Sequence, residues 1–148
     1  MPTSVKLSEL LDAYEWVSGL GPFENSAYLD RTTGKIYIDS DQIEVDEDLP
    51  EDYEDGTKYV SIPHKNDLDL GKNLAIQFAD DFLWQESVKV REFFRKRGAY
   101  ARFKNLLEHR RMLEQWYIYE AEAIESALRE WAQDNDIQIQ PDIQKTPG

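Results

Sequence analysis

Apolar residues recur along this chain with two different periods, and the change of period divides it in two. In the first part, after one helix-like segment over 7–17, apolar residues stand in short runs separated by turn-forming residues. From residue 64 onward they recur every three or four positions, which is the spacing of one helix face. Strands followed by helices indicate an α+β domain, with helices packed on one face of a small antiparallel sheet.

Three short runs in the first part have the composition of β-strands. Two of them, 27–29 and 36–38, flank a polar segment that contains Gly34, and this order predicts a hairpin. The third run, 58–62, is followed by Pro63 and adds one more strand. Three strands with an apolar face can be stable where an isolated pair is marginal. We therefore predict a three-stranded antiparallel sheet.

The same reasoning predicts about five helices, most of them in a helical C-terminal half. The first covers 7–17, capped by Ser4 or Ser8 and ended near Gly19. The others carry these apolar stripes: Leu70, Leu74, Phe78 and Phe82; Val90, Phe93 and Phe94; Tyr100, Phe103, Leu106 and Leu107; and a long one from Leu113 to Trp131. We expect mostly buried side chains at Phe103, Leu107, Trp116, Ile124 and Trp131.

The length of 148 residues is usual for a single domain with a real core, and we predict one domain over 1–137. Residues 138–148 contain two prolines among polar residues, which predicts a disordered tail. The segment 39–55 holds ten carboxylates and no basic residue, so we expect a solvated, mobile loop there.

Composition limits the functions that this chain can have. The net charge is −13, and a field of that sign opposes long-range attraction to nucleic acid and to anionic membranes. Cysteine is absent, which excludes disulfides, thiolate catalysis and Cys-ligated zinc. No run approaches 18 apolar residues, and the first residues lack the apolar stretch of a signal peptide. We therefore expect a cytoplasmic protein that does not associate with membranes.

The sequence contains no recognisable catalytic, cofactor or metal motif. Its two histidines, His64 and His109, are far apart in the sequence and lack the spacing of metal ligands. Glycine-rich phosphate loops and the common hydrolase and metalloprotease motifs are missing. The carboxylates after residue 39 lack the glycine and the glutamate spacing of a calcium loop. We expect no catalytic residue, no cofactor and no metal, and an interaction protein rather than an enzyme.

Residues 89–111 reverse the charge of the chain, with nine Lys and Arg against two Glu. Such asymmetry is typical of an interaction surface. Basic and aromatic residues surround Gly98 there, and more aromatic residues follow shortly afterwards. The residues predicted to bind a partner are Arg97, Tyr100, Arg102, Lys104, Trp116, Tyr117 and Tyr119.

The partner of this surface is left open by the sequence. Arginine and aromatic residues dominate protein interfaces, which favours another protein. Alternatively, Trp116, Tyr117 and Tyr119 form a stacking platform for nucleic acid, although the net charge opposes this. Aromatic residues at helical spacing are also more often part of a core. An enzyme without a recognisable motif is a third alternative.

A structural explanation of the basic segment is open as well. The cations at 95–97 would stand in the last turn of a helix that ends at Gly98, where they offset the partial negative charge of the helix end. Glu92 would then pair with Lys96 four positions later. In another arrangement, the acidic segment 39–55 lies against the basic surface.

The stretch Arg-Gly-Ala-Tyr-Ala-Arg-Phe-Lys at 97–104, with Glu-Gln-Trp-Tyr at 114–117, resembles Uncharacterised Protein Family 0158, a bacterial group. The resemblance continues through Ala123, Ala127 and Trp131. It is weaker over the opening residues and the hairpin. It implies a small bacterial cytoplasmic protein of one domain, and it transfers no catalytic residue.

Overall fold

The computed structural model describes residues 3–19, 25–40 and 48–140. The chain divides into two compact units: unit 1 consists of residues 1–65 and 127–148, and unit 2 of residues 66–126. Helix α5 (Leu113–Asp134) contributes residues to both units. That residues 1–137 act as one domain stays a prediction.

Unit 1 contains the predicted antiparallel sheet. Strands β2 (Asn25–Asp30), β3 (Ile36–Ser40) and β4 (Tyr59–Ser61) pair in the order β3-β2-β4, which confirms the hairpin and its third strand. The turn between β2 and β3 requires Gly34, whose φ is +79°. A Cβ at this position would also lie 2.2 Å from the carbonyl oxygen of Ser4, so only glycine fits.

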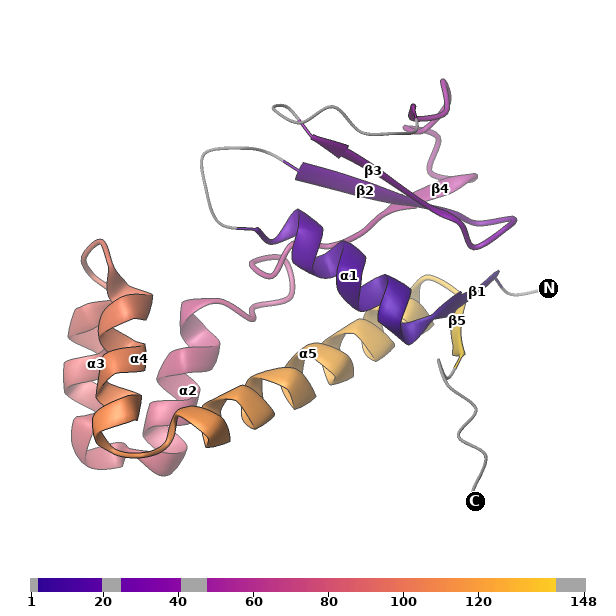
Figure 1. The fold of residues 1–148 in the computed structure, drawn as a ribbon. Helices are drawn as coiled ribbons and strands as arrows, with labels where there is room; N and C mark the ends of the chain where they lie inside the picture. Colours follow the sequence, from indigo (N-terminus) through magenta and orange to yellow (C-terminus); the bar gives the residue numbers. More distant parts are fainter. Residues whose placement is uncertain (1–2, 20–24, 41–47, 141–148) are drawn as a thin grey trace, which may run out of the picture. The chain divides into compact units, whose positions relative to one another are not determined.

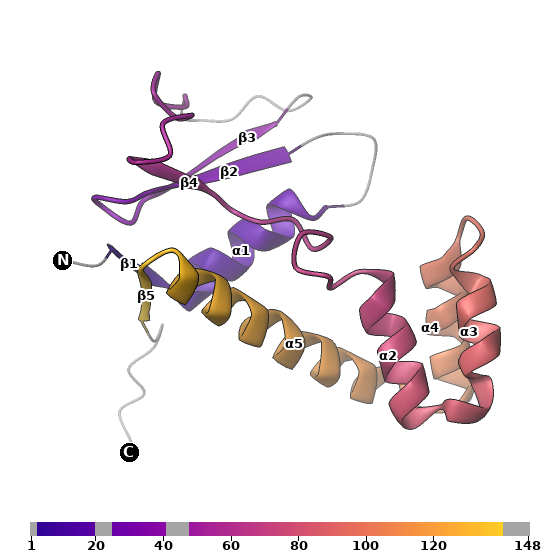
Figure 2. The same ribbon diagram turned by 180° about the vertical axis from the view of Figure 1, so that it is seen from behind.

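Helix α1 (Leu7–Val17) packs on one face of this sheet, as Figures 1 and 2 show from opposite sides. The helix begins after Lys6, and no side chain caps it, so the predicted cap at Ser4 or Ser8 is wrong. Ser4 lies instead in strand β1 (Thr3–Lys6), which the sequence did not predict. Because the backbone of Ser4 is extended in this strand, its side chain does not cap the first turn of α1.

Strand β1 pairs in parallel with β5 (Ile137–Gln140), which follows α5. Residues 138–140 therefore form a strand and correct the predicted start of the disordered tail. The remaining residues of that tail lie outside the described part of the chain. Ile137 is buried, and an extended backbone turns alternate residues toward the interior. Four residues are too short a pattern to indicate a strand whose partner lies at the other end of the chain.

The predicted acidic loop over 39–55 is corrected in part. Asp39 belongs to strand β3, and residues 51–54 form a turn. Tyr53 in this turn packs edge-on against Tyr28 of β2, with ring centroids 4.9 Å apart. Residues 41–47 lie outside the described residues. The part that is described is held against the sheet by an aromatic contact that a count of charges does not indicate.

Unit 2 is helical, as the period of its apolar residues predicts. Together with the helices already named, the described part of the chain has five α-helices and confirms the α+β fold. The elements of unit 2 before α5 are α2 (Lys72–Phe82), the short 3-10 helix η1 (Trp84–Glu86), α3 (Ser87–Phe93) and α4 (Ala99–His109).

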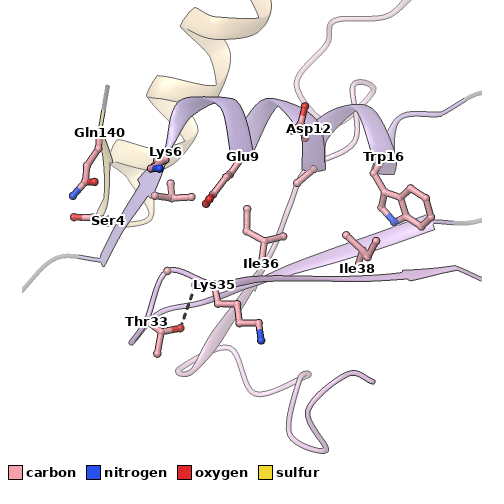
Figure 3. A pocket seen from close by; sticks show the side chains of 13 residues that line it. Ser4, Lys6, Glu9, Asp12, Trp16, Thr33, Lys35, Ile36, Ile38 and Gln140 are labelled. Atoms are coloured by element: carbon pink, nitrogen blue, oxygen red, sulfur yellow. Dashed lines mark hydrogen bonds between the residues drawn. The ribbon is translucent and has the colours of Figure 1, made fainter. Parts of the chain in front are cut away.

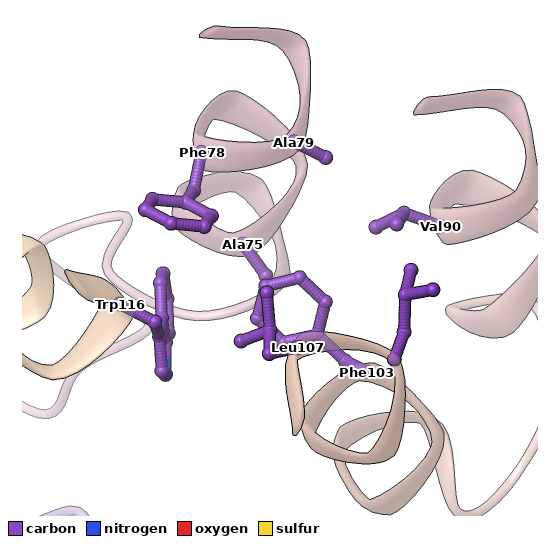
Figure 4. Close-up of a cluster of buried hydrophobic side chains, with 8 residues drawn as sticks. Ala75, Phe78, Ala79, Val90, Phe103, Leu107 and Trp116 are labelled. Atoms are coloured by element: carbon purple, nitrogen blue, oxygen red, sulfur yellow. The ribbon is translucent and has the colours of Figure 1, made fainter. Parts of the chain in front are cut away.

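A cluster of buried side chains joins the helices of unit 2 (Figure 4). The indole of Trp116 is fully buried in it, 5.3 Å from the ring of Phe78 and 5.0 Å from that of Phe103, both edge-to-face. Pairs with this geometry stabilise a core by roughly 0.5–1.5 kcal/mol beyond the burial of their area. Leu107 is fully buried beside them. The predicted burial of Phe103, Leu107 and Trp116 is thereby confirmed.

Ile124 and Trp131, further along α5, are less deeply buried than these three, but most of the surface of each is covered, as predicted. Both belong to the apolar stripe of the helix. A stripe gives the side of the helix that turns toward the interior, but it does not say how much of a 22-residue helix is covered.

Candidate functional site

The predicted binding segment forms the junction between α3 and α4. Helix α3 ends at Phe93, so the cations at 95–97 stand in the turn after the helix rather than in its last turn. Gly98 precedes α4 with a φ of +76°, a left-handed conformation that residues with side chains rarely adopt. The helix-end explanation of these cations is therefore corrected: they are exposed in a turn that glycine makes possible.

The cations of 89–111 fall into a paired and an unpaired group. Arg91, Arg95 and Arg110 form ion pairs. Glu92 pairs with Arg95, three positions later, with 3.4 Å between Oε1 and Nη1. The predicted pair of Glu92 with Lys96 is wrong. The other six are exposed, and among the described residues none of them has a carboxylate within ion-pair distance: Lys89, Lys96, Arg97, Arg102, Lys104 and Arg111.

Arg102 is fixed in place by the turn that precedes it. Its Nη1 donates a hydrogen bond to the carbonyl oxygen of Arg97 at 2.5 Å. Together with Glu92, Phe93 and Lys96, it lines a small hollow of about 270 Å³. Two cations and one carboxylate leave this hollow with a positive charge.

Lys104 and Tyr117 bring α4 and the start of α5 together. The Nζ of Lys104 lies 5.6 Å from the centre of the Tyr117 ring, within the range of a cation–π contact. The tyrosine is 46% exposed. A basic head on α4, two positions after Arg102, therefore lies beside an accessible aromatic ring.

The other predicted aromatic residues do not lie on this surface. Trp116 is 1% exposed, and the ring of Tyr119 lies nearly parallel to it at 6.1 Å. Tyr100 is half-buried with its ring 5.1 Å from that of Phe94, and burial raises the pKa of its hydroxyl. The predicted stacking platform is wrong, because its largest member belongs to the core and only Tyr117 is exposed.

A second candidate site lies in unit 1 and was missed by sequence analysis. It is a groove of about 770 Å³ between α1 and β3, closed at one end by β1 (Figure 3). Its apolar lining includes Trp16, Ile36 and Ile38, and its polar lining includes Glu9 and Asp12. The alternation of the two isoleucines was visible in the sequence. The way the helix crosses the hairpin was not, and that crossing creates the groove.

Both surfaces combine charged side chains with accessible apolar groups. Over 3–19, 25–40 and 48–140, no three His, Asp or Glu side chains gather as metal ligands would. Within the same ranges, no helix has both the length and the apolar composition needed to cross a bilayer.

Comparison with known proteins gives one match. Residues 1–144 match the Uncharacterised protein family (UPF0158). No curated protein and no solved structure matches the chain. The family match confirms the resemblance carried by the segment around Gly98 and by the aromatic residues of α5.

Proposed function

Since the chain belongs to the Uncharacterised protein family (UPF0158), whose description names no ligand, we propose a function from its own residues: it binds an acidic segment of another protein. The contact area is the helix-junction surface, which consists of Lys96, Arg97, Arg102, Lys104 and Tyr117. One observation carries the proposal. The four cations of this surface are exposed, and no described carboxylate lies within ion-pair distance of any of them.

The unpaired state of these cations needs a physical reason. The chain has 30 carboxylates and only 17 Lys and Arg, so internal partners are plentiful. Lys96 and Arg102 line one hollow, and Arg102 contacts the backbone of Arg97, so these three residues lie close together. Like charges at short distance repel one another and destabilise the folded state unless an anion approaches. An acidic partner would supply that anion, and neighbouring Arg and Tyr side chains are the types that contribute most at protein interfaces.

One feature favours a protein partner over nucleic acid. Stacking sites for single strands need several accessible rings, and Trp116 is buried. One exposed ring beside Lys104 suits a protein contact, in which a few apolar atoms accompany the charges.

Affinity capture from an extract of the source cell tests this proposal. The wild-type chain is compared with the double charge reversal Arg102→Glu/Lys104→Glu, each with and without nuclease. We expect a protein that wild type captures in both conditions and that the double variant fails to capture. Equal capture by both chains would contradict the proposal. Capture that disappears with nuclease and falls steeply with salt would identify the nucleic-acid alternative instead.

A matched pair of single variants separates the surface from net charge. Lys104→Glu and Lys72→Glu each make the chain more negative by the same amount, and both lysines are exposed. Lys72 begins α2 and lies outside the basic segment. Capture should fall with Lys104→Glu and persist with Lys72→Glu. The same loss in both would mean that total charge, and not this surface, controls binding.

A further inference from the structure

We propose that the groove between α1 and β3 binds an extended peptide, which adds to the outer edge of β3 as a strand. A Lys or Arg side chain of the peptide would enter the groove, with its stem on Ile36 and Ile38 and its charged head beside Glu9 and Asp12. This site is separate from the helix-junction surface and uses only residues of unit 1.

The backbone of β3 has groups available for pairing. β3 is an outer strand of the sheet, and no described strand pairs with its other edge. The N–H of Ile62 donates to the carbonyl of Ala27, so Ala27 directs its backbone groups toward the β4 side of β2. Ala27 stands opposite Ile38 in the register of β2 and β3. Because successive residues of a strand bond in opposite directions, the backbone groups of Ile36 and Ile38 point away from β2.

The same two isoleucines supply the apolar floor. Residues opposite each other in a sheet share a face, so Ile36 and Ile38 lie on the face of Ala27 and Leu29, which α1 covers. Figure 3 shows both isoleucine side chains pointing from β3 toward α1. Ile38 is 37% exposed, so apolar surface remains uncovered beside the unpaired edge.

Both ends of the groove are fixed. At one end the indole Nε1 of Trp16 donates to the carbonyl oxygens of Ser26 and Asp39, at 3.0 and 3.1 Å. At the other end Gly34 lies directly against the backbone of Ser4. A groove with fixed ends requires little rearrangement to receive a ligand, which favours affinity.

The length of the groove fits a short strand. Its lining on the helical side runs from Lys6 to Trp16, which at 1.5 Å per residue is roughly 15 Å. An extended chain rises by about 3.3 Å per residue, so about five residues of a peptide would span it.

Charge determines which peptide fits. Glu9 and Asp12 are three positions apart on α1 and so share one side of the helix; both are exposed, and no described cation lies within ion-pair distance. Lys35 lines the rim, but its side chain points away from the groove (Figure 3), with Nζ 4.9 Å from the ring of Tyr37. Lys6 stands at the β1 end. A basic side chain in the middle would therefore meet the carboxylate of Glu9, which points toward the hairpin in Figure 3, with Asp12 about one turn further along α1.

The test uses the full chain labelled with ¹⁵N and blocked pentapeptides of the form X-Thr-Lys-Thr-X, where X is Val, Ile or Leu. In an added strand the two X residues and the lysine face the groove together. At millimolar peptide, the amides of Ile36 and Ile38 should shift and exchange more slowly with solvent. No response at these two amides would contradict the proposal. The peptides with Glu in place of Lys should bind about tenfold more weakly, and equal binding would overturn the role of the carboxylates.

Variants of the protein separate the two parts of the proposal. Glu9→Lys should weaken binding about fivefold, whereas the control Glu15→Lys, on the same helix but outside the groove, should leave it unchanged. Ile38→Ala keeps the outward N–H of β3, and Ile38→Pro removes it. The proline variant should bind more weakly than the alanine variant. Equal affinities of these two would show that no strand pairs with β3.

Discussion

The two units of this chain carry charge in different ways. Unit 1 has 19 Asp and Glu against seven Lys and Arg, whereas unit 2 has 11 against ten. The acidity of the whole chain therefore belongs almost entirely to unit 1, and the positive helix-junction surface belongs to a unit that is close to neutral. A net charge averaged over the chain hides both facts, so partners have to be inferred surface by surface.

The units also differ in how their chains come together. Unit 2 is one continuous stretch of sequence, with helices that gather around Trp116. Unit 1 combines the two ends of the chain, because β1 pairs with β5. Both units bury apolar side chains, but the core of unit 2 comes from one continuous segment, whereas that of unit 1 combines residues from both ends of the chain.

The largest effect is expected in the core of unit 2. Trp116→Ala should lower the free energy of unfolding by about 3–5 kcal/mol, because it leaves a cavity among the rings of the cluster. Trp84 is 70% exposed, and Trp84→Ala should change this free energy by less than about 0.5 kcal/mol. Urea denaturation followed by circular dichroism measures both. Similar losses in the two variants would contradict the burial of Trp116 in the core of unit 2.

A smaller effect is expected at the turn of unit 1. Gly34→Ala should cost about 1–2 kcal/mol for the left-handed backbone alone, and the approach to Ser4 adds to this. A Cβ added at Gly56 would meet no atom within 4 Å, so Gly56→Ala is the matched control. Amide exchange in β1 and β3 should accelerate only in the first variant. If the two variants exchange alike, the described contact between the turn and β1 is wrong.

Acid should weaken the ion pairs of unit 2. Hydrogen bonds from Arg91 and Arg110 hold the pKa of Asp80 and that of Glu86 below their ordinary values of 3.8 and 4.5. A carboxyl with a lowered folded-state pKa contributes stability above its ordinary pKa and loses it as the pH falls through the folded value.

The measurement is the free energy of unfolding of wild type and of Arg91→Gln/Arg110→Gln, in urea across a range of pH. The difference between them should be largest near neutral pH and should shrink as the pH falls below about 4. A difference that stays constant with pH would show that these arginines act through packing and not through the two carboxylates.

The smallest effect on stability is expected on the helix-junction surface itself. Arg102→Glu/Lys104→Glu should lower the melting temperature by no more than a few degrees, because exposed charges contribute little to folding. Thermal denaturation checks this. If the double variant unfolds, the contact of Arg102 with the carbonyl of Arg97 holds the junction together, and the surface is structural.

The contrast between the units also explains what could be predicted from the sequence. Helix α2 follows from the three- and four-residue spacing of the apolar residues around Phe78, and α4 from the same spacing around Phe103. A helical period is a local property, so the sequence contains it. The hairpin follows from the turn at Gly34 for the same reason. The pairing of β1 with β5 joins distant parts of the chain, and no local pattern contains it.

Candidate sites were predictable to a similar degree. The charge reversal around Gly98 identified the helix-junction surface, because charge is written directly in the sequence. The sequence could not show which aromatic residues share that surface. Trp116 and Tyr117 are neighbours in the sequence, and only the packing of the fold places one in the core and the other on the surface. The groove of unit 1 depends on three elements at once, so its residues gave no joint signal.

The central claim, that the helix-junction surface binds an acidic segment of a protein, is tested most directly by nuclear magnetic resonance. Decaglutamate is titrated into the ¹⁵N-labelled full chain at low salt. We expect amide shifts concentrated at residues 96–104 and at Tyr117. These shifts should weaken as salt is added and should be absent in the variant Arg102→Glu/Lys104→Glu. Absence of these shifts, or the same shifts in the double variant, would contradict the central claim.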